Sequence, residues 1–200
     1  MTVELTECTL EVAGTSLTVR NLTADDSLTL LALHKRVFGL GTSRAWYNWK
    51  YGHGPGAGNG LGSGIWAGNE LVAHCGGVPR LLWARGQSIQ GLQIGDVMVD
   101  PAWRGVLTRR GPFFQVSRHF YSTQIGSGCQ FMTGFGFPSA RPLKLAKMLD
   151  LLEDGGSVLG LDWAVTPSQA AGLNPLAWRL EPLDAQTLHG QNMLTRAWAA

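Results

Sequence analysis

The chain has 200 residues, of which 44% are hydrophobic and 15% are charged. This composition is typical of one globular domain with a sizeable core. A formal net charge of +2 is too small to indicate a nucleic-acid surface, which usually needs dense stripes of Lys and Arg. Neither a signal peptide nor an apolar run of roughly 18 residues is present. We therefore expect a cytoplasmic protein that binds neither nucleic acid nor a membrane.

The three cysteines, Cys8, Cys75 and Cys129, are far apart and lack C-x-x-C spacing. We expect reduced, mostly buried thiols, with neither a disulfide framework nor a zinc site. His74 adjoins Cys75, but neighbours in a strand point to opposite faces of the sheet and do not easily activate each other.

The first part of the chain predicts strands followed by two helices. Residues 9–23 suit a strand or hairpin, and residues 24–39 suit a helix that begins after Thr23. The segment "TSRAWYNWKYG" predicts a second helix, with Trp46 and Trp49 on one face.

Residues 52–64, "GHGPGAGNGLGSG", have a glycine at every second position. A phosphate-binding loop needs a strand before it and a helix after it. Here a predicted helix precedes the glycines and a predicted strand follows them. We therefore interpret this stretch as a flexible connector rich in positive-φ positions, rather than a phosphate cradle.

The rest of the chain alternates strands and helices, which predicts a mixed α/β layer fold. The expected strands are 65–66, 71–83, 92–100 and 129–137, with two more at 157–165 and 176–183. The expected helices begin at Pro112 and after Ser139, and the second of these would bury Leu145, Met148, Leu149 and Leu152.

The segment "DVMVDPAWRGVLTRRGPF" is the strongest candidate for phosphate binding, because a strand runs through a loop directly into an amphipathic helix. Backbone amides from Val106 to Gly111 would form an anion nest at the positive end of that helix. Arg104, Arg109 and Arg110 would add positive charge without a metal.

Four motifs in order resemble a divergent group of the GCN5-related N-acetyltransferase (GNAT) superfamily: "WKY" at 49–51, "DVMV" at 96–99, "RG" at 104–105 and "GFP" at 136–138. The resemblance covers about residues 10–182. It implies a central mixed sheet with helices on both faces and a splayed pair of parallel strands, 92–100 and 129–137. It also implies one acyltransferase domain, residues 1–182. The segment "WRLEPLDAQTLHGQNMLTRAWAA" loosely repeats "VRNLTADDSLTLLALHKRVFG", so the helix expected at 183–200 is either a docking helix or the start of a truncated second unit.

The same resemblance implies acetyl-CoA or another acyl-CoA as donor, with no metal and no covalent intermediate. A backbone amide near Met98 or Val99 would hold the oxyanion. The pyrophosphate would lie on the loop that consists of Arg104, Gly105, Val106, Leu107, Thr108, Arg109, Arg110 and Gly111.

Two departures from the family pattern stand in this sequence. Leu107 and Arg109 occupy positions where the family loop has small residues, although Gly111 could replace part of their role. No tyrosine follows the second splayed strand to act as general acid, so water would protonate the thiolate that leaves.

Asp96 is our candidate general base, because it would share a strand face with Ile94 and Met98, and apolar neighbours can raise the pKa of a carboxylate. The alternative for Asp96 is a hydrogen-bonded structural carboxylate. Asp100 is the second candidate, and its alternative is a turn residue before Pro101.

The resemblance also places the acceptor wall just before the strand hairpin, where Trp46, Trp49, Tyr51 and the glycine-rich stretch would line it, and His74 would face the cleft from the hairpin. Aromatic side chains at this spacing are alternatively part of a core. His119, on the polar face of the helix after the loop, is expected to be solvated.

The leading hypothesis is an acyl-CoA-dependent N-acyltransferase that transfers an acetyl group to a primary amine of a small molecule. One alternative is a non-catalytic module of the same fold that senses CoA or binds a partner protein. Another is an acyltransferase whose donor is carried by an acyl carrier protein, bound through Arg104, Arg109 and Arg110. A homodimer is left open.

Overall fold

The computed structural model describes residues 8–12, 14–39, 41–51, 61–158 and 191–192. The chain divides into two units, residues 1–155 and 156–200, and the elements below all belong to the first. The strands expected at 157–165 and 176–183 and the helix expected at 183–200 fall almost entirely outside the described residues. They remain predictions, as does the boundary at residue 182.

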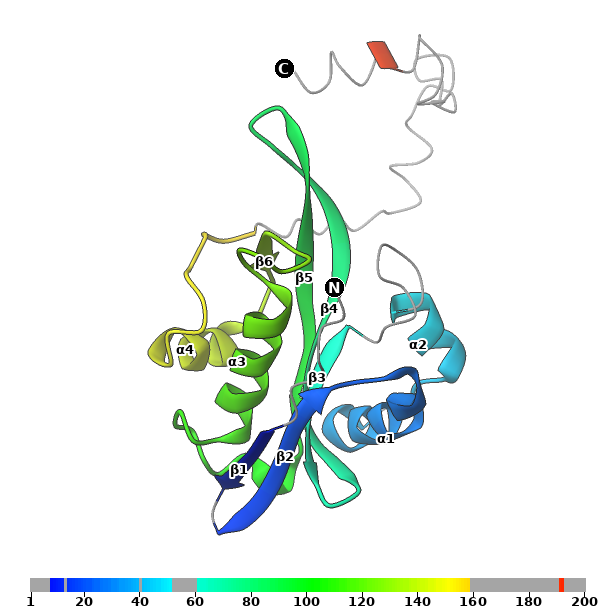
Figure 1. The fold of residues 1–200 in the computed structure, drawn as a ribbon, viewed down its shortest axis with the longest axis vertical. Coiled ribbons are helices and arrows are strands. Elements are labelled where there is room, and N and C mark those ends of the chain that lie inside the picture. The colour runs from blue at the N-terminus through cyan, green and yellow to red at the C-terminus, as the bar shows by residue number, and fades with distance from the viewer. Residues whose placement is uncertain (1–7, 13, 40, 52–60, 159–190, 193–200) are drawn as a thin grey trace, which may run out of the picture. The chain divides into compact units, whose positions relative to one another are not determined.

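A six-stranded mixed sheet in the order β1-β2-β3-β4-β5-β6 forms the centre of the first unit (Figure 1). Neighbouring strands are antiparallel except β5 and β6, which are parallel. The strands are β1 (Cys8–Val12), β2 (Thr15–Asn21), β3 (Gly62–Ala67), β4 (Glu70–Ala84), β5 (Gln87–Val99) and β6 (Thr133–Phe135). The predicted mixed α/β sheet with a parallel strand pair is confirmed.

Helices cover both faces of this sheet (Figure 1). α1 (Ser27–Phe38) and α2 (Arg44–Tyr51) lie on one face, and α3 (Pro112–Gln124) and α4 (Ala140–Met148) lie on the other. Short 3-10 turns at Ala24–Asp26 and Pro101–Trp103 precede α1 and follow β5.

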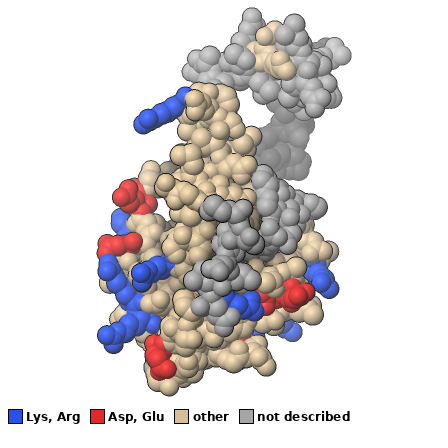
Figure 2. Space-filling model, in the orientation of Figure 1, with Lys and Arg blue, Asp and Glu red and all other residues tan. Residues whose placement is uncertain are grey.

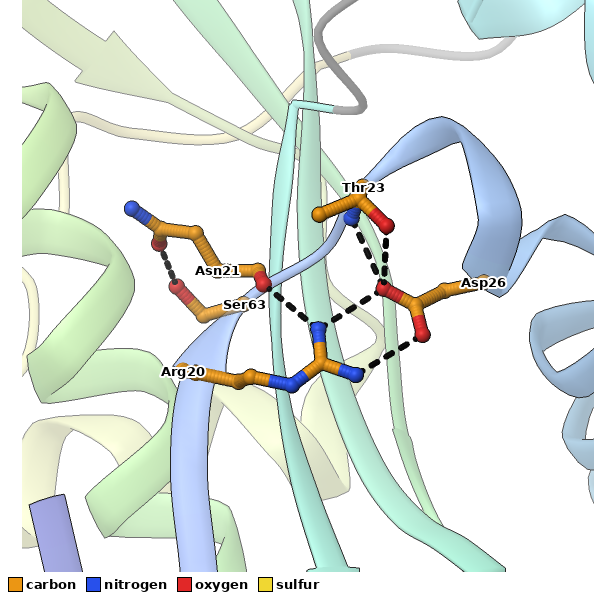
Figure 3. A network of polar contacts seen from close by, with 5 residues as sticks. All are labelled: Arg20, Asn21, Thr23, Asp26 and Ser63. Carbon is orange, nitrogen blue, oxygen red and sulfur yellow. Dashed lines mark hydrogen bonds and ion pairs between the residues drawn. The ribbon is translucent and has the colours of Figure 1, made fainter. Parts of the chain in front are cut away.

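Polar contacts fix the chain where β2 gives way to the first helices (Figure 3). Both terminal nitrogens of Arg20 donate to the Asp26 carboxylate at 2.8 Å, and the Thr23 amide donates to the same carboxylate at 2.8 Å. α1 then ends at Gly39, whose φ of 73° is the left-handed conformation that favours glycine. The helix predicted to begin after Thr23 is thus confirmed.

Each face of the sheet has its own hydrophobic core. Under α3, Val116 and Phe120 pack with sheet residues that include Ile65 and Leu92. Under α1 and α2, Leu33 and Met98 belong to a separate cluster. The remaining buried members of this second cluster are Leu22, Leu30, Tyr47, Tyr51, Trp66, Leu71 and Val78.

Two elements near the end of the first unit are shorter than predicted. β6 is Thr133–Phe135 instead of 129–137, with one isolated bridge between Ile125 and Phe131 before it. α4 ends at Met148, which is 70% exposed instead of buried, whereas Leu149 caps the helix and is buried. The predicted burial of Met148 is therefore wrong.

Residues 62–64, at the end of the glycine-rich stretch, belong to β3 and not to a connector. A Cβ on Gly62 would lie 2.6 Å from the His74 ring, and one on Gly64 would lie 2.5 Å from Leu71. Close packing, and not positive φ, therefore explains these two glycines. The interpretation of residues 52–60 falls outside the described residues.

On the face drawn in Figure 2, charged side chains of both signs lie around the helices, whereas much of the β4–β5 hairpin is uncharged. Leu81 and Trp83 on this hairpin are 75% and 69% exposed. Cys75 is buried, but Cys8 is exposed and Cys129 half-buried, so the expectation of mostly buried thiols holds for Cys75 alone. No helix in the described part of the chain is long and apolar enough to span a bilayer.

Candidate active site

A β-bulge in β5 reverses the side-chain alternation of that strand at Asp96. Met98 is opposite His74 and Gly95 is opposite Gly76, so two residues of β5 face a single residue of β4. Asp96 itself has a φ of 50°. As a result Ile94 packs toward the α3 core and Met98 toward the core beneath α2. The prediction that Ile94 and Met98 share one face is wrong, because the extra residue separates them.

The β5–β6 pair separates just before this bulge. Their paired register runs from Gly91↔Thr133 to Gln93↔Phe135, and α3 follows the open end of β5 through the loop at 104–111. The splayed parallel pair implied by the resemblance is present, over a shorter β6.

The Val99 amide points to the open edge of β5. The Asp100 amide donates to the Val72 carbonyl of β4 at 2.8 Å. Since amides of successive residues in an antiparallel strand point alternately to the two sides, the Val99 amide faces away from β4. Met98, by the same alternation, directs its amide toward β4. Of the two amides proposed for an oxyanion, that of Val99 has the suitable direction.

Asp96 belongs to a polar network with α2. The Lys50 ammonium donates to both Asp96 oxygens at 2.8 and 2.7 Å, and the Tyr51 hydroxyl donates to the Asp96 carboxylate. Burial alone would raise the pKa of Asp96, but the hydrogen bonds from Lys50 and Tyr51 outweigh it and lower that pKa below its ordinary value. The expected raised pKa is therefore wrong, and Asp96 is an ionised carboxylate at neutral pH.

Burial and the neighbouring carboxylate raise the pKa of Tyr51 well above 10. The Tyr51 phenol is thus neutral and remains a hydrogen-bond donor to Asp96 at neutral pH. Together the three side chains contain one ammonium, one carboxylate and one phenol, so their formal charges cancel.

His74 completes this network from β4. Its Nδ1 is 2.8 Å from the Asp96 carbonyl oxygen, and since a carbonyl only accepts, Nδ1 carries the hydrogen. Burial lowers the pKa of His74 to about 4, so the ring is neutral. The side chain lies beside Tyr51 with ring centroids 6.5 Å apart, on the face opposite the buried Cys75, as the alternation predicts.

A cavity of 320 Å³ adjoins the network, between α2 and the β4–β5 sheet. Such a volume lies at the lower end of the range for small-molecule sites. Its lining residues are Trp49, Lys50, Val78, Arg80, Gln93, Ile94 and Gly95. The cavity therefore borders the open edge of β5 and the bulge at once.

The four proposed acceptor residues lie in two settings. Trp49 is 66% exposed and lines the cavity. Trp46 packs partly against the α2-side core, and Tyr51 and His74 are buried in the network beside the cavity. The buried side of α2 carries Tyr47 and Tyr51, so the alternative that Trp46 and Trp49 both belong to a core does not hold for Trp49.

Asp100 has a structural environment. Its carboxylate accepts from the Arg36 Nε at 2.6 Å and from the Ala102 amide at 3.0 Å. Although burial opposes the effect, these donors lower the pKa of Asp100. Its partners fit the turn residue that we gave as the alternative, and we drop Asp100 as a catalytic candidate.

The loop at 104–111 supplies fewer amides than predicted. The Gly111 amide donates to the Thr108 carbonyl at 2.9 Å and the Arg110 amide to the Thr108 hydroxyl at 3.3 Å. A Cβ on Gly111 would lie 1.8 Å from the Val106 carbonyl oxygen. The nest expected from Val106 to Gly111 is therefore wrong for Arg110 and Gly111, whose amides are engaged within the loop.

Gly105 and Leu107, earlier in the same loop, are packed less closely by other protein atoms than Gly111. A Cβ on Gly105 would meet no protein atom within 4 Å, and the Leu107 side chain is 56% exposed. Arg104 donates to the Val99 carbonyl at 2.9 Å, and Arg109 pairs with Asp150 after α4. Leu107 is thus largely in contact with solvent, and Arg109 is directed to Asp150.

His119 is not solvated as expected. Its Nδ1 is 2.8 Å from the Ser63 hydroxyl, and that hydroxyl donates to the Asn21 side chain at 2.8 Å. These contacts connect α3 to β3 and β2 (Figure 3 shows Asn21 and Ser63).

Sequence reasoning did not single out Lys50, Arg80 and Gln93. Lys50 lies within the "WKY" motif, which was noted only as part of a resemblance. Arg80 and Gln93 approach each other through the β4–β5 register, and Arg80 Nε donates to Gln93 Oε1 at 2.8 Å. No local pattern in the sequence indicates such a cross-strand contact.

No family model and no curated protein matches this sequence, whereas many solved structures do. An aminoglycoside acetyltransferase from an uncultured soil metagenomic sample is 18% identical, with a TM-score of 0.53 over 76% of this chain and 100% of that one. An aminoglycoside N-acetyltransferase in complex with CoA is 14% identical, with a TM-score of 0.52 over 78% of this chain and 100% of that one.

A GCN5-related N-acetyltransferase from Kribbella flavida is 23% identical, with a TM-score of 0.42 over 53% of this chain. The match spans only 26% of that longer protein. The mixed sheet, the parallel β5–β6 pair and the loop before α3 agree with the fold that the resemblance implies. The described part of this chain therefore has the fold of the GCN5-related N-acetyltransferases.

Proposed function

We propose that the protein is an acyl-CoA-dependent N-acyltransferase that transfers an acetyl group to a primary amine of a small molecule. The observation that carries this proposal is the open edge of β5 at the splay, with the cavity on one side and the loop at 104–111 after it. Two solved structures of this fold are aminoglycoside acetyltransferases, and one of them is in complex with CoA.

The residues around the β5 edge fit an acyl-CoA in part. The open space beside Gly105 and the start of α3 would hold the pyrophosphate, while the Val99 amide would hold an oxyanion. Acetyl-CoA would supply the activated acyl thioester. The engaged amides of Arg110 and Gly111 would contribute nothing to its binding.

Asp96 would act through its charge. Because its pKa is lowered, it is a weak base, and its negative charge would hold the Lys50 ammonium beside the cavity that the amine enters. The proton of that amine would pass to water. The amine itself would enter through the cavity that Trp49 and Lys50 line.

The test begins with calorimetric titration of acetyl-CoA into the purified protein, with CoA as a parallel titrant, followed by assays of thiol release with a panel of primary amines. We expect saturable one-site binding of both ligands and turnover of at least one amine. Saturable binding without turnover of any amine would favour the non-catalytic module. No saturation at millimolar ligand would contradict the use of CoA.

An Asp96→Asn variant tests the site assignment, because Asn tolerates the positive φ at this position while it removes the charge. We expect kcat/KM for the amine to fall by roughly a hundredfold and the affinity for acetyl-CoA to stay unchanged. Equal rates in both proteins across the pH range would assign Asp96 to the fold alone.

A further inference from the structure

We infer that the acceptor amine also carries an oxyanion, a carboxylate or a phosphate, which Arg80 binds. This inference rests on the proposed function, since it concerns the acceptor cavity of the same site. It goes further by naming the chemical class of the acceptor.

The charges around the cavity carry the argument. Two cationic side chains line it, Lys50 and Arg80. Lys50 is neutralised by Asp96, which accepts from its ammonium through both carboxylate oxygens. Arg80, by contrast, donates only to neutral oxygens among its contacts in the described part of the chain, at Gln93 and the Pro79 carbonyl. The lining therefore has one uncompensated positive charge.

The geometry of Arg80 suits an anion. Its Nε is held by Gln93 Oε1 at 2.8 Å, and its Nη1 by the Pro79 carbonyl at 3.3 Å. A guanidinium has five N–H donors, so further donors remain for a ligand. Because Gln93 and the backbone already fix the side chain, less conformational entropy is lost when an oxyanion binds.

The position of Arg80 connects it to the acceptor cavity. Its guanidinium is bonded to Gln93, which lines the cavity together with Gly95. The paired register of β5 with β6 ends at Gln93. An oxyanion bound by Arg80 would therefore lie in the cavity beside the separating strands.

A polycationic acceptor fits this cavity poorly. The aminoglycosides acted on by the two enzymes of this fold carry several amines that are protonated at neutral pH. Carboxylates on the protein would attract them, but Asp96, the carboxylate next to this cavity, is already paired with Lys50. Among the described lining residues of this cavity, none carries a carboxylate that would attract a polycation.

The experiment compares matched acceptors that differ in the anion only. Glycylglycine is assayed against glycylglycinamide, O-phosphoethanolamine against ethanolamine, and an aminoglycoside is included as a polycation. Release of CoA from acetyl-CoA is measured for the wild type, for Arg80→Gln and for Arg80→Lys. Arg118→Gln serves as the control, because Arg118 is exposed on α3, on the other face of the sheet.

We expect at least one anionic member to exceed its neutral partner in kcat/KM by roughly tenfold to a hundredfold, as a charge-assisted hydrogen bond provides. Arg80→Gln should reduce this preference for the anionic acceptor to nearly none, and Arg80→Lys should keep part of it. Arg118→Gln should leave the preference unchanged. A preference within the glycylglycine pair indicates that Arg80 binds a carboxylate, and a preference within the O-phosphoethanolamine pair indicates a phosphate.

Preferential turnover of the neutral members or of the aminoglycoside would overturn this inference while the proposed function stands. An anionic preference that survives in Arg80→Gln would overturn the assignment to Arg80. If acetyl-CoA binds but the wild type acetylates no member of the panel or of the wider amine set, the proposed function fails, and this inference fails with it.

Discussion

His74 is a neutral base held between two glycines and a backbone carbonyl. A Cβ on Gly62 or on Gly76 would lie 2.6 Å from its ring, so both positions must lack a side chain for the ring to fit. This packing gives the ring one orientation and one tautomer, with the Nδ1 hydrogen directed to the Asp96 carbonyl. His74 thereby supports the bulge from which Asp96 projects.

The burial of His74 predicts an acid-dependent loss of stability. The unfolded chain protonates this ring below pH about 6.5, but the folded protein does so only near its pKa of about 4. The stability present above pH 6.5 should therefore fall as the pH decreases to 4, by up to about 3 kcal/mol at roughly 1.4 kcal/mol per pH unit. Urea unfolding at a series of pH values measures this.

A His74→Gln variant provides the control for that experiment, because its side chain does not titrate. Its free energy of unfolding should change less steeply between pH 6.5 and 4 than that of the wild type, whatever its stability at neutral pH. Parallel pH dependences in the two proteins would contradict the assignment.

At the scale of elements, the loop before α3 contains two glycines with different roles. Gly111 is pressed against the Val106 carbonyl, whereas a side chain at Gly105 would project into space that no protein atom fills. Gly111→Ala should therefore lower the melting temperature. Gly105→Ala should leave it unchanged but weaken acetyl-CoA binding by roughly tenfold, because a methyl group would occupy the place of the pyrophosphate.

Melting curves and acetyl-CoA titrations of the two variants separate these effects. Wild-type affinity in a folded Gly105→Ala protein would exclude contact between this glycine and the ligand. An unchanged melting temperature in Gly111→Ala would mean that the loop adopts another path.

The sequence pattern was sufficient for the elements whose burial alternates regularly. The order of strands and helices, the start of α1 after Thr23 and the start of α3 at Pro112 all follow from caps and apolar periodicity. The full β4–β5 hairpin did not follow, because residues 84–90 are mostly exposed and have no regular apolar alternation. Their pairing depends on the turn at Arg85 and Gly86, both at positive φ.

The candidate site was predictable only in part for a related reason. Asp96, Tyr51 and His74 were identified as single residues, but the pKa of Asp96 was expected to shift in the wrong direction. That expectation assumed an unbroken strand, whereas the bulge directs Asp96 to Lys50 and Tyr51. An insertion of one residue in a ladder leaves no trace in local composition.

At the scale of the molecule, the first unit contains everything needed for its own core. Both hydrophobic clusters draw their buried residues from positions 12–131, and the candidate site lies between residues 46 and 111. The chain divides after Gly155. We therefore expect residues 1–155 to fold without the remainder.

A truncation after Gly155 tests this expectation. The shortened protein should melt cooperatively, within a few degrees of the full chain, and should bind acetyl-CoA with the same affinity. If the acyltransferase domain instead extends to residue 182, as the sequence resemblance implies, the truncation removes two strands. Loss of a cooperative transition would then support the longer boundary.

The positive φ of Asp96 restricts how this protein can diverge during evolution. Asn and Gly tolerate such a backbone but cannot neutralise Lys50, whereas Glu carries the charge but is strained in the left-handed region. While Lys50 is retained, aspartate alone satisfies the backbone and the ion pair together. Asp96 is therefore constrained in evolution. A related protein that replaces it must also replace Lys50, lose the bulge in β5 or use a different chemistry.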